Sequence, residues 1–263
     1  MGFYVEVENN VKLFVEDIQP GGNITILFIH GWPLSHKQFE YQYDVLPAKG
    51  FRCIGYDWRG YGDSDKPFTG YDYDRMADDL RVLIHQLKLD NLTLVGHSTG
   101  AAIAARYATR YGGFGVSKLV LVSGALPTGF TPDKAKELLE ETYNDRPNMW
   151  RKTIDGFFFQ QISEAFRDFF SQIGYQAAGY ATAAIIRTLR DSNLTAELSL
   201  ITLPTLIIHG IHDQVVPFAQ AQEVHKLITN SRLVPFHFSG HAPFYDERGR
   251  FNEVVSQFAN SEK

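Results

Sequence analysis

The chain has 263 residues, 44% of them hydrophobic, and a formal net charge of −5 at pH 7. This length suits one globular domain with a large core. The negative net charge and the absence of any run of Lys and Arg residues argue against nucleic acid or a membrane surface as a partner. The N-terminus lacks the basic and apolar regions of a signal peptide, and the single cysteine, Cys53, cannot form an intrachain disulfide, so we expect a cytoplasmic protein.

The first 125 residues predict an alternation of strands and helices. Alternating apolar residues on either side of Asn9 and Asn10 indicate an antiparallel hairpin. Continuous apolar runs indicate strands that are buried on both faces of a parallel sheet. The predicted elements, in chain order, are the hairpin over 5–15, a strand over 24–29, a helix over 35–49, a strand over 51–56, a helix over 73–87, a strand from 92, a helix ending near 111 and a strand over 118–122.

From 126 to 198 the alternation of predicted strands and helices stops. Helix-forming segments rich in aromatic residues occupy this stretch, which is too long for a loop. We interpret 126–198 as a helical cap inserted into a core made of 1–125 and 199–263. We expect an aromatic face of the insertion to cover the mouth of a ligand site, while most of its aromatic side chains pack in the insertion's own core. Most of its Lys and Arg residues, Lys134 and Lys152 among them, should face solvent, so that the pocket offers no fixed cation. The aromatic residues are Phe157, Phe158, Phe159, Phe166, Phe169, Phe170, Tyr175 and Tyr180.

After the insertion the alternation resumes. The predicted elements are a strand over 204–208, a helix over 219–228, a strand over 232–238 and a helix over 251–259. Strands alternating with helices after an antiparallel start predict an α/β fold, with a mostly parallel, doubly wound sheet of about eight strands.

The segment 92–103 places a Gly-x-Ser-x-Gly pentapeptide, Gly96 to Gly100, between an apolar strand and an Ala-rich helix. This context is typical of a nucleophile elbow, a sharp turn that lifts a serine onto the corner between strand and helix. Side chains at the two glycine positions would collide there. The helix that starts after Ser98 also offers backbone N–H groups and its positive end to an oxyanion.

A serine hydroxyl is a weak nucleophile at neutral pH, so a histidine must take its proton and an acid must orient that histidine. His241 and Asp213 each follow a predicted strand, at the sheet edge where the carboxyl ends of strands meet. The order Ser98, Asp213, His241 is the one expected when the serine lies on an elbow. We therefore predict these three residues as a catalytic triad.

Four separated motifs together resemble the α/β-hydrolase family over nearly the whole chain: His30-Gly31-Trp32, Asp57 to Ser64, the elbow, and the Asp213–His241 pair. The run from His30 to Ser35, Gly70 to Tyr73 and Arg106-Tyr107 are similar to bacterial aryl esterases and cofactor-free haloperoxidases. The resemblance implies oxyanion donors in the backbone N–H groups of Trp32 and Thr99, with no metal and no cofactor. The elbow departs from that subgroup at His97, Thr99, Ala101 and Ala102.

The remaining polar residues of these motifs are expected to have structural roles. His30 should hold the oxyanion loop by a hydrogen bond, and His97 should be buried and hydrogen-bonded. His209 and His212 flank the acid without a third ligand at metal-binding spacing. The three aspartates of the Gly-rich loop should fix that loop; they are Asp57, Asp63 and Asp65.

Serine at the elbow favours attack on an acyl carbon. We therefore expect a serine hydrolase that cleaves small to medium uncharged carboxylic esters. The motifs leave open a lactone or C–C substrate and a perhydrolase or haloperoxidase side activity. A ligand sensor with slow turnover that signals to a protein partner is the alternative of another class, and the sequence leaves the oligomeric state open.

Overall fold

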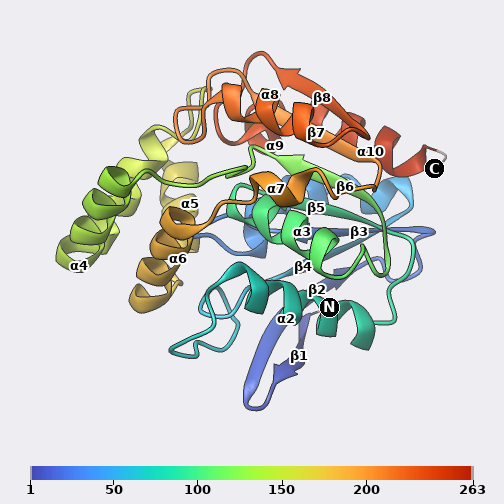
Figure 1. Ribbon diagram of the computed structural model, residues 1–263, viewed down its shortest axis with the longest axis horizontal. Helices are drawn as coiled ribbons and strands as arrows, with labels where there is room; N and C mark the ends of the chain where they lie inside the picture. The colour runs from blue at the N-terminus through green and yellow to red at the C-terminus, as the bar shows by residue number, and fades with distance from the viewer. Residues whose placement is uncertain (1, 262–263) are drawn as a thin grey trace.

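The computed structural model describes residues 2–261 and is organised around one eight-stranded sheet (Figure 1). The strand order is β1-β2-β4-β3-β5-β6-β7-β8. The β1/β2 and β2/β4 pairs are antiparallel and all the others are parallel, which confirms the predicted sheet. The strands are β1 (Gly2–Glu8), β2 (Val11–Ile18), β3 (Ile24–Ile29), β4 (Phe51–Tyr56), β5 (Leu92–His97), β6 (Val116–Val122), β7 (Thr205–Gly210) and β8 (Ser231–Phe236).

Helices cover both faces of the sheet (Figure 1). Successive residues of a strand point to opposite faces, so Leu27 and Ile29 join the core under α2 and α3, whereas Ile26 and Phe28 join the core under α10. The α-helices of the core are α1 (Glu40–Tyr43), α2 (Tyr73–Gln86), α3 (Thr99–Arg110), α8 (Phe218–Leu227), α9 (Pro243–Asp246) and α10 (Arg248–Asn260). Within residues 2–261, no helix is both long and apolar enough to span a membrane.

The prediction of one continuous helix over 35–49 is wrong. The segment forms three short pieces: the 3-10 turn η1 (His36–Phe39), α1, and the 3-10 turn η2 (Pro47–Lys49). Pro47 has no backbone N–H for a preceding helical turn. At the other end, Asp57 Oδ1 accepts hydrogen bonds from both the backbone and the ring of His36, each at 2.7 Å. These long-range contacts fix the segment against the sheet.

The chain between β6 and β7 forms the helices α4 (Pro132–Asp155), α5 (Glu164–Tyr175), α6 (Gly179–Asp191) and α7 (Thr195–Leu198). Helices α4, α5 and α6 lie together at one end of the sheet, whereas α7 lies beside α3 (Figure 1). Helix α4 is kinked at Asp145, two residues before Pro147, and Asp145 Oδ1 accepts the N–H of Asn148 at 3.2 Å to restart the helix. The assignment of 126–198 as a cap domain stays a prediction.

Candidate active site

The turn between β5 and α3 has the geometry that the pentapeptide predicts. Ser98 has φ 54° and ψ −117°, a conformation that is rare for a residue with a side chain. A Cβ on Gly96 would meet the carbonyl of Gly100, and a Cβ on Gly100 would meet the carbonyls of Ile29 and His30. Both glycines are therefore required by close backbone contacts, as the sequence argument expects.

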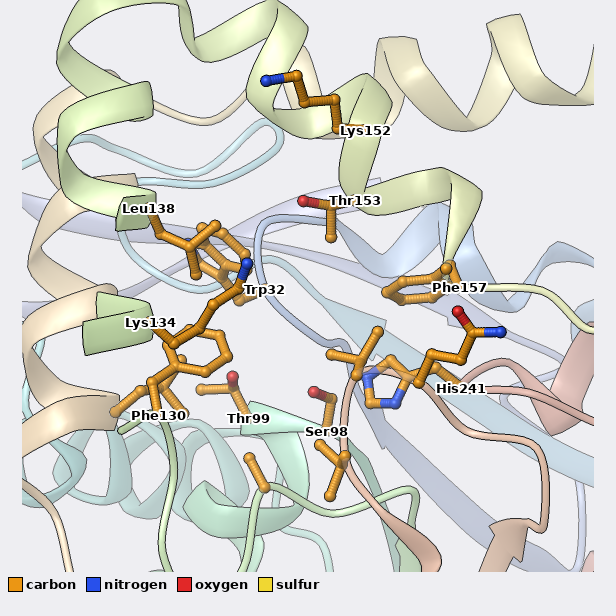
Figure 2. A pocket seen from close by; sticks show the side chains of 16 residues that line it. Trp32, Ser98, Thr99, Phe130, Lys134, Leu138, Lys152, Thr153, Phe157 and His241 are labelled. Atoms are coloured by element: carbon orange, nitrogen blue, oxygen red, sulfur yellow. The ribbon is translucent and has the colours of Figure 1, made fainter. Parts of the chain in front are cut away.

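Ser98 opens into a pocket of about 440 Å³ between the sheet and the α4–α7 helices. Figure 2 shows Ser98, Thr99 and His241 at one side of this pocket, with Trp32 and Phe130 facing Phe157 across it. Most of the wall is apolar, as is typical of small-molecule sites. Its apolar side chains include Phe130, Leu138, Phe157, Leu189, Val215 and Val216.

Asp213 and His241 meet beneath this pocket, although 28 residues separate them. His241 Nδ1 lies 2.8 Å from Asp213 Oδ2, and both side chains are buried. A carboxylate only accepts hydrogen bonds, so the His241 proton is on Nδ1 and the lone pair is on Nε2. No hydrogen bond joins Ser98 Oγ to His241 within residues 2–261; such contacts are often long in ligand-free enzymes.

Asp213 is held as an anion by its surroundings. Its Oδ1 accepts the backbone N–H groups of Val215 and Val216, both at 2.8 Å, and His209 Nε2 lies 3.1 Å from its Oδ2. Burial alone would raise the pKa of Asp213, but the charge of His241 and the hydrogen bonds from His209 and His241 lower it well below its ordinary value. The carboxylate is thus ionised wherever the protein is folded near neutral pH.

His97 supports His241 from the β5 side. Its Nε2 lies 2.9 Å from the backbone carbonyl of His241, so Nε2 carries the proton. Burial and the nearby charge of His241 lower the pKa of His97 well below its usual value. The ring is therefore neutral and anchors His241, which confirms the expectation of a buried, hydrogen-bonded histidine.

The two residues predicted as oxyanion donors, Trp32 and Thr99, both line the pocket with Ser98. Thr99 is the first residue of α3 and Trp32 follows β3. Neither N–H is used in a hydrogen bond within residues 2–261. The side chain of Trp32 is fixed by its Nε1–H, which donates to the carbonyl of Thr182 in α6 at 3.2 Å.

His30 holds the loop that carries Trp32, as predicted. Its Nδ1 lies 2.9 Å from the Gly31 carbonyl, and its Nε2 accepts the N–H of Trp58 at 3.1 Å. The rings of His30 and Trp58 stack, with centroids 4.2 Å apart. Both nitrogens are thereby committed to the neutral form, and burial lowers the pKa of His30 to about 4.

This histidine predicts a specific pH dependence of stability. The unfolded chain protonates His30 below a pKa of about 6.5, whereas the folded state keeps it neutral down to about 4, so acid favours unfolding. Between pH 7 and pH 5 we expect His30 to remove about 2 kcal/mol of unfolding free energy. Urea unfolding at both pH values should show a loss that is about 2 kcal/mol larger in the wild type than in His30→Gln, since other groups such as His97 contribute to both. An equal loss in both proteins would contradict the assignment.

Asp246, at the end of α9, is a residue that the sequence reasoning missed. Its carboxylate accepts backbone N–H groups from Phe159 and Gln160 of the insertion and from Gly240, at 2.8 to 3.1 Å. The N–H of His241 donates to the carbonyl of Phe157 at 2.8 Å. These bonds join the α4–α5 connection to the loop that carries His241.

One expectation about the insertion is met by the structure and one needs correction. Of the eight aromatic residues named from the sequence, only Phe157 lines the pocket; Phe158, Phe166 and Phe170 pack against one another. Lys134 and Lys152 line the pocket as well, so it does contain cations.

Both lysines are paired and about half exposed. Lys134 Nζ lies 3.0 Å from Glu137, and Lys152 Nζ lies 2.6 Å from Glu141. Figure 2 shows Lys152 at the end of the pocket away from Ser98. The two lysines are thus partly exposed side chains of the pocket wall.

The other polar residues of the motifs have the expected structural roles. Asp57 Oδ2 accepts the N–H of Asp63 at 2.8 Å, and Asp65 Oδ2 accepts the N–H of Lys12 at 2.7 Å. His212 stacks on Phe159, with centroids 3.9 Å apart. Cys53 is buried.

Comparisons with known proteins agree with this architecture. Residues 24–162 match the family model of the alpha/beta hydrolase fold. The AB hydrolase superfamily protein YisY of Bacillus subtilis is 44% identical, over 99% of this chain and 100% of that protein. An esterase (EaEST) from Exiguobacterium antarcticum has a TM-score of 0.96 and 40% identity, over 99% of this chain and 100% of that chain.

A bromoperoxidase from Bacillus anthracis is also similar, with a TM-score of 0.94 and 30% identity, over 99% of this chain and 100% of that chain. The family model covers more than half of the chain, and these three relatives each cover 99% of it. The chain therefore belongs to the α/β-hydrolase superfamily and is a hydrolase.

Proposed function

We propose that this protein is a serine hydrolase that cleaves small to medium uncharged carboxylic esters through an acyl-enzyme on Ser98. The observation that carries the proposal is the 2.8 Å contact between His241 Nδ1 and Asp213 Oδ2 at a pocket that Ser98 and His241 both line. The Exiguobacterium antarcticum structure, which is named an esterase, supports the same reaction class.

In the first half of the reaction, His241 Nε2 takes the proton of Ser98 as its oxygen attacks the ester carbonyl. Asp213 keeps the His241 proton on Nδ1 and stabilises the imidazolium that forms. The bond to the alcohol then breaks, and His241 gives its proton to the leaving oxygen. The acyl group remains on Ser98.

The tetrahedral intermediate carries negative charge on the former carbonyl oxygen. The backbone N–H groups of Trp32 and Thr99 are proposed to bind it, because both residues line the pocket beside Ser98. Water, activated by His241, then repeats the sequence and releases the acid. Each step needs only groups that the chain itself supplies.

Pocket size and polarity support the substrate class. The volume of about 440 Å³ suits a short acyl or aryl group, and most of the lining residues are apolar. The two lysines of the pocket wall are each neutralised by a glutamate. A bulky or anionic acyl group gains little from such a wall.

A series of nitrophenyl esters of increasing acyl length tests this assignment. We expect turnover of about 1 per second or more on the short esters and a steep fall once the chain exceeds the pocket. Leu138→Ala, which widens the wall, should move the optimum to longer chains. Leu200→Ala is the matched control, because Leu200 is 67% exposed and outside the pocket.

The same series with added hydrogen peroxide tests perhydrolysis, in which peroxide replaces water as the acceptor of the acyl group. Peracid formation would add that side activity to the esterase. Stoichiometric acylation of Ser98 without turnover on any ester would contradict the proposal, and would favour a lactone or C–C substrate or a ligand sensor.

A further inference from the structure

His209, the next-to-last residue of β7, is buried against the acid of the proposed triad. Its Nε2 lies 2.8 Å from the carbonyl of Val216 and 3.1 Å from Asp213 Oδ2. The N–H of Val216 in turn donates to Asp213 Oδ1 at 2.8 Å. His209 therefore contacts the carboxylate directly and also holds the turn that supplies one of its backbone donors.

The protonation of His209 follows from its partners. A carbonyl and an ionised carboxylate only accept hydrogen bonds, so Nε2 must carry a proton. Its Nδ1 is buried and has no hydrogen-bond partner within residues 2–261. His209 thus offers its Nε2–H as a donor, whereas His241 must change its protonation state during the reaction.

We infer that His209 is a positioning residue for catalysis, which fixes the Asp213 carboxylate so that Oδ2 faces His241 Nδ1. This inference rests on the proposed function of Ser98, Asp213 and His241. The His209 N–H donates to the Val216 carbonyl, and the same nitrogen lies 3.1 Å from Oδ2, which accepts the N–H of His241; Oδ1 accepts two backbone N–H groups. Without His209, Oδ2 loses this neighbouring N–H and the 213–216 turn loses an anchor.

Loss of the His209 donor should affect the titration of His241 in one direction. A carboxylate with fewer donors is a stronger acceptor for the remaining one, which favours the protonated form of His241. The titratable side chains in contact with Asp213 or its partner are His97, His209 and His241. His97 is neutral and His209 is the residue that is replaced, so His241 is the group whose titration the change should move.

Two substitutions of His209 separate positioning from packing. His209→Phe keeps a ring and removes the donor, whereas His209→Gln keeps an amide N–H at a similar distance from the backbone. We expect His209→Phe to lower kcat about 10- to 100-fold, the range known for residues that orient a functional ligand. The midpoint of the acid limb of kcat/KM should rise by about half a unit or more, and KM should change little.

His209→Gln should restore most of kcat and the wild-type pH profile. Proton NMR gives a readout independent of turnover: the low-field resonance of the His241 Nδ1–H should shift in the Phe variant and return in the Gln variant. His225→Gln is the matched control, since His225 is exposed on α8 and should leave rate and pH profile unchanged.

An unchanged pH profile and NMR resonance in His209→Phe would overturn the inference, whatever happens to its stability. A fall in rate that is equal in the Phe and Gln variants would also overturn it, because packing would then be the cause. Failure of the proposed function is distinguishable, because Ser98→Ala would then retain activity in the same assays.

Discussion

Ser98→Ala should lower ester hydrolysis by about 10⁶-fold, the loss known for removal of the nucleophile in a serine protease. The substitution removes the attacking oxygen and little else, because Ser98 Oγ makes no hydrogen bond within residues 2–261 and the backbone turn is held by Gly96 and Gly100. The free energy of unfolding should change by less than about 1 kcal/mol. Steady-state rates and urea unfolding measure the two effects.

Covalent labelling checks the nucleophile independently of turnover. A fluorophosphonate should add once to the wild type, on the peptide that contains Ser98, and not to Ser98→Ala. Ser199→Ala, at an exposed serine outside the pocket, should label like the wild type. Labelling at another residue, with activity kept in Ser98→Ala, would exclude Ser98 as the nucleophile.

Asp213→Asn should lower kcat by about 10⁴-fold, as the same change does in serine proteases. Oδ1 of Asp213 faces two backbone N–H groups and Oδ2 faces the N–H groups of His209 and His241. In either orientation the Asn amide therefore points its NH₂ at donors. His241 would then favour the proton on Nε2, and it would no longer act as a base.

The measurement is kcat and KM on a short nitrophenyl ester, with KM expected to change little because Asp213 is not among the residues that line the pocket. Asp63→Asn is the matched control: Asp63 is exposed and pairs with Lys37 at 3.6 Å. Near-normal rates in Asp213→Asn, or a large loss in Asp63→Asn, would assign the acid to a different residue.

Much of the fold was determined by local patterns in the sequence. Continuous apolar runs such as 24–29 and 92–97 can be buried only in the middle of a sheet, and the structure places them as β3 and β5. The turn at Ser98 was predictable because the need for Gly96 and Gly100 is a steric property of the turn itself. The order of Ser98, Asp213 and His241 followed from where strands end.

Other features depended on partners far away in the sequence. The helix expected over 35–49 is broken where His36 turns toward Asp57. The one feature of the sequence that pointed to a role for His209 is its position four residues before Asp213. No feature of the sequence pointed to Asp246, because its three hydrogen-bond donors come from two separate loops.

The sequence by itself determined the sheet, the elbow and the candidate triad, because periodicity, glycine sterics and strand ends are short-range properties. Only the tertiary structure decided which face of the inserted helices meets the pocket, so that Phe157, Lys134 and Lys152 line it while most other aromatic residues pack together. It also decided that two buried histidines, His97 and His209, contact His241 and Asp213. The physical reason is that a hydrogen bond needs its donor and acceptor within about 3 Å, and distance between residues far apart in the chain is set by packing.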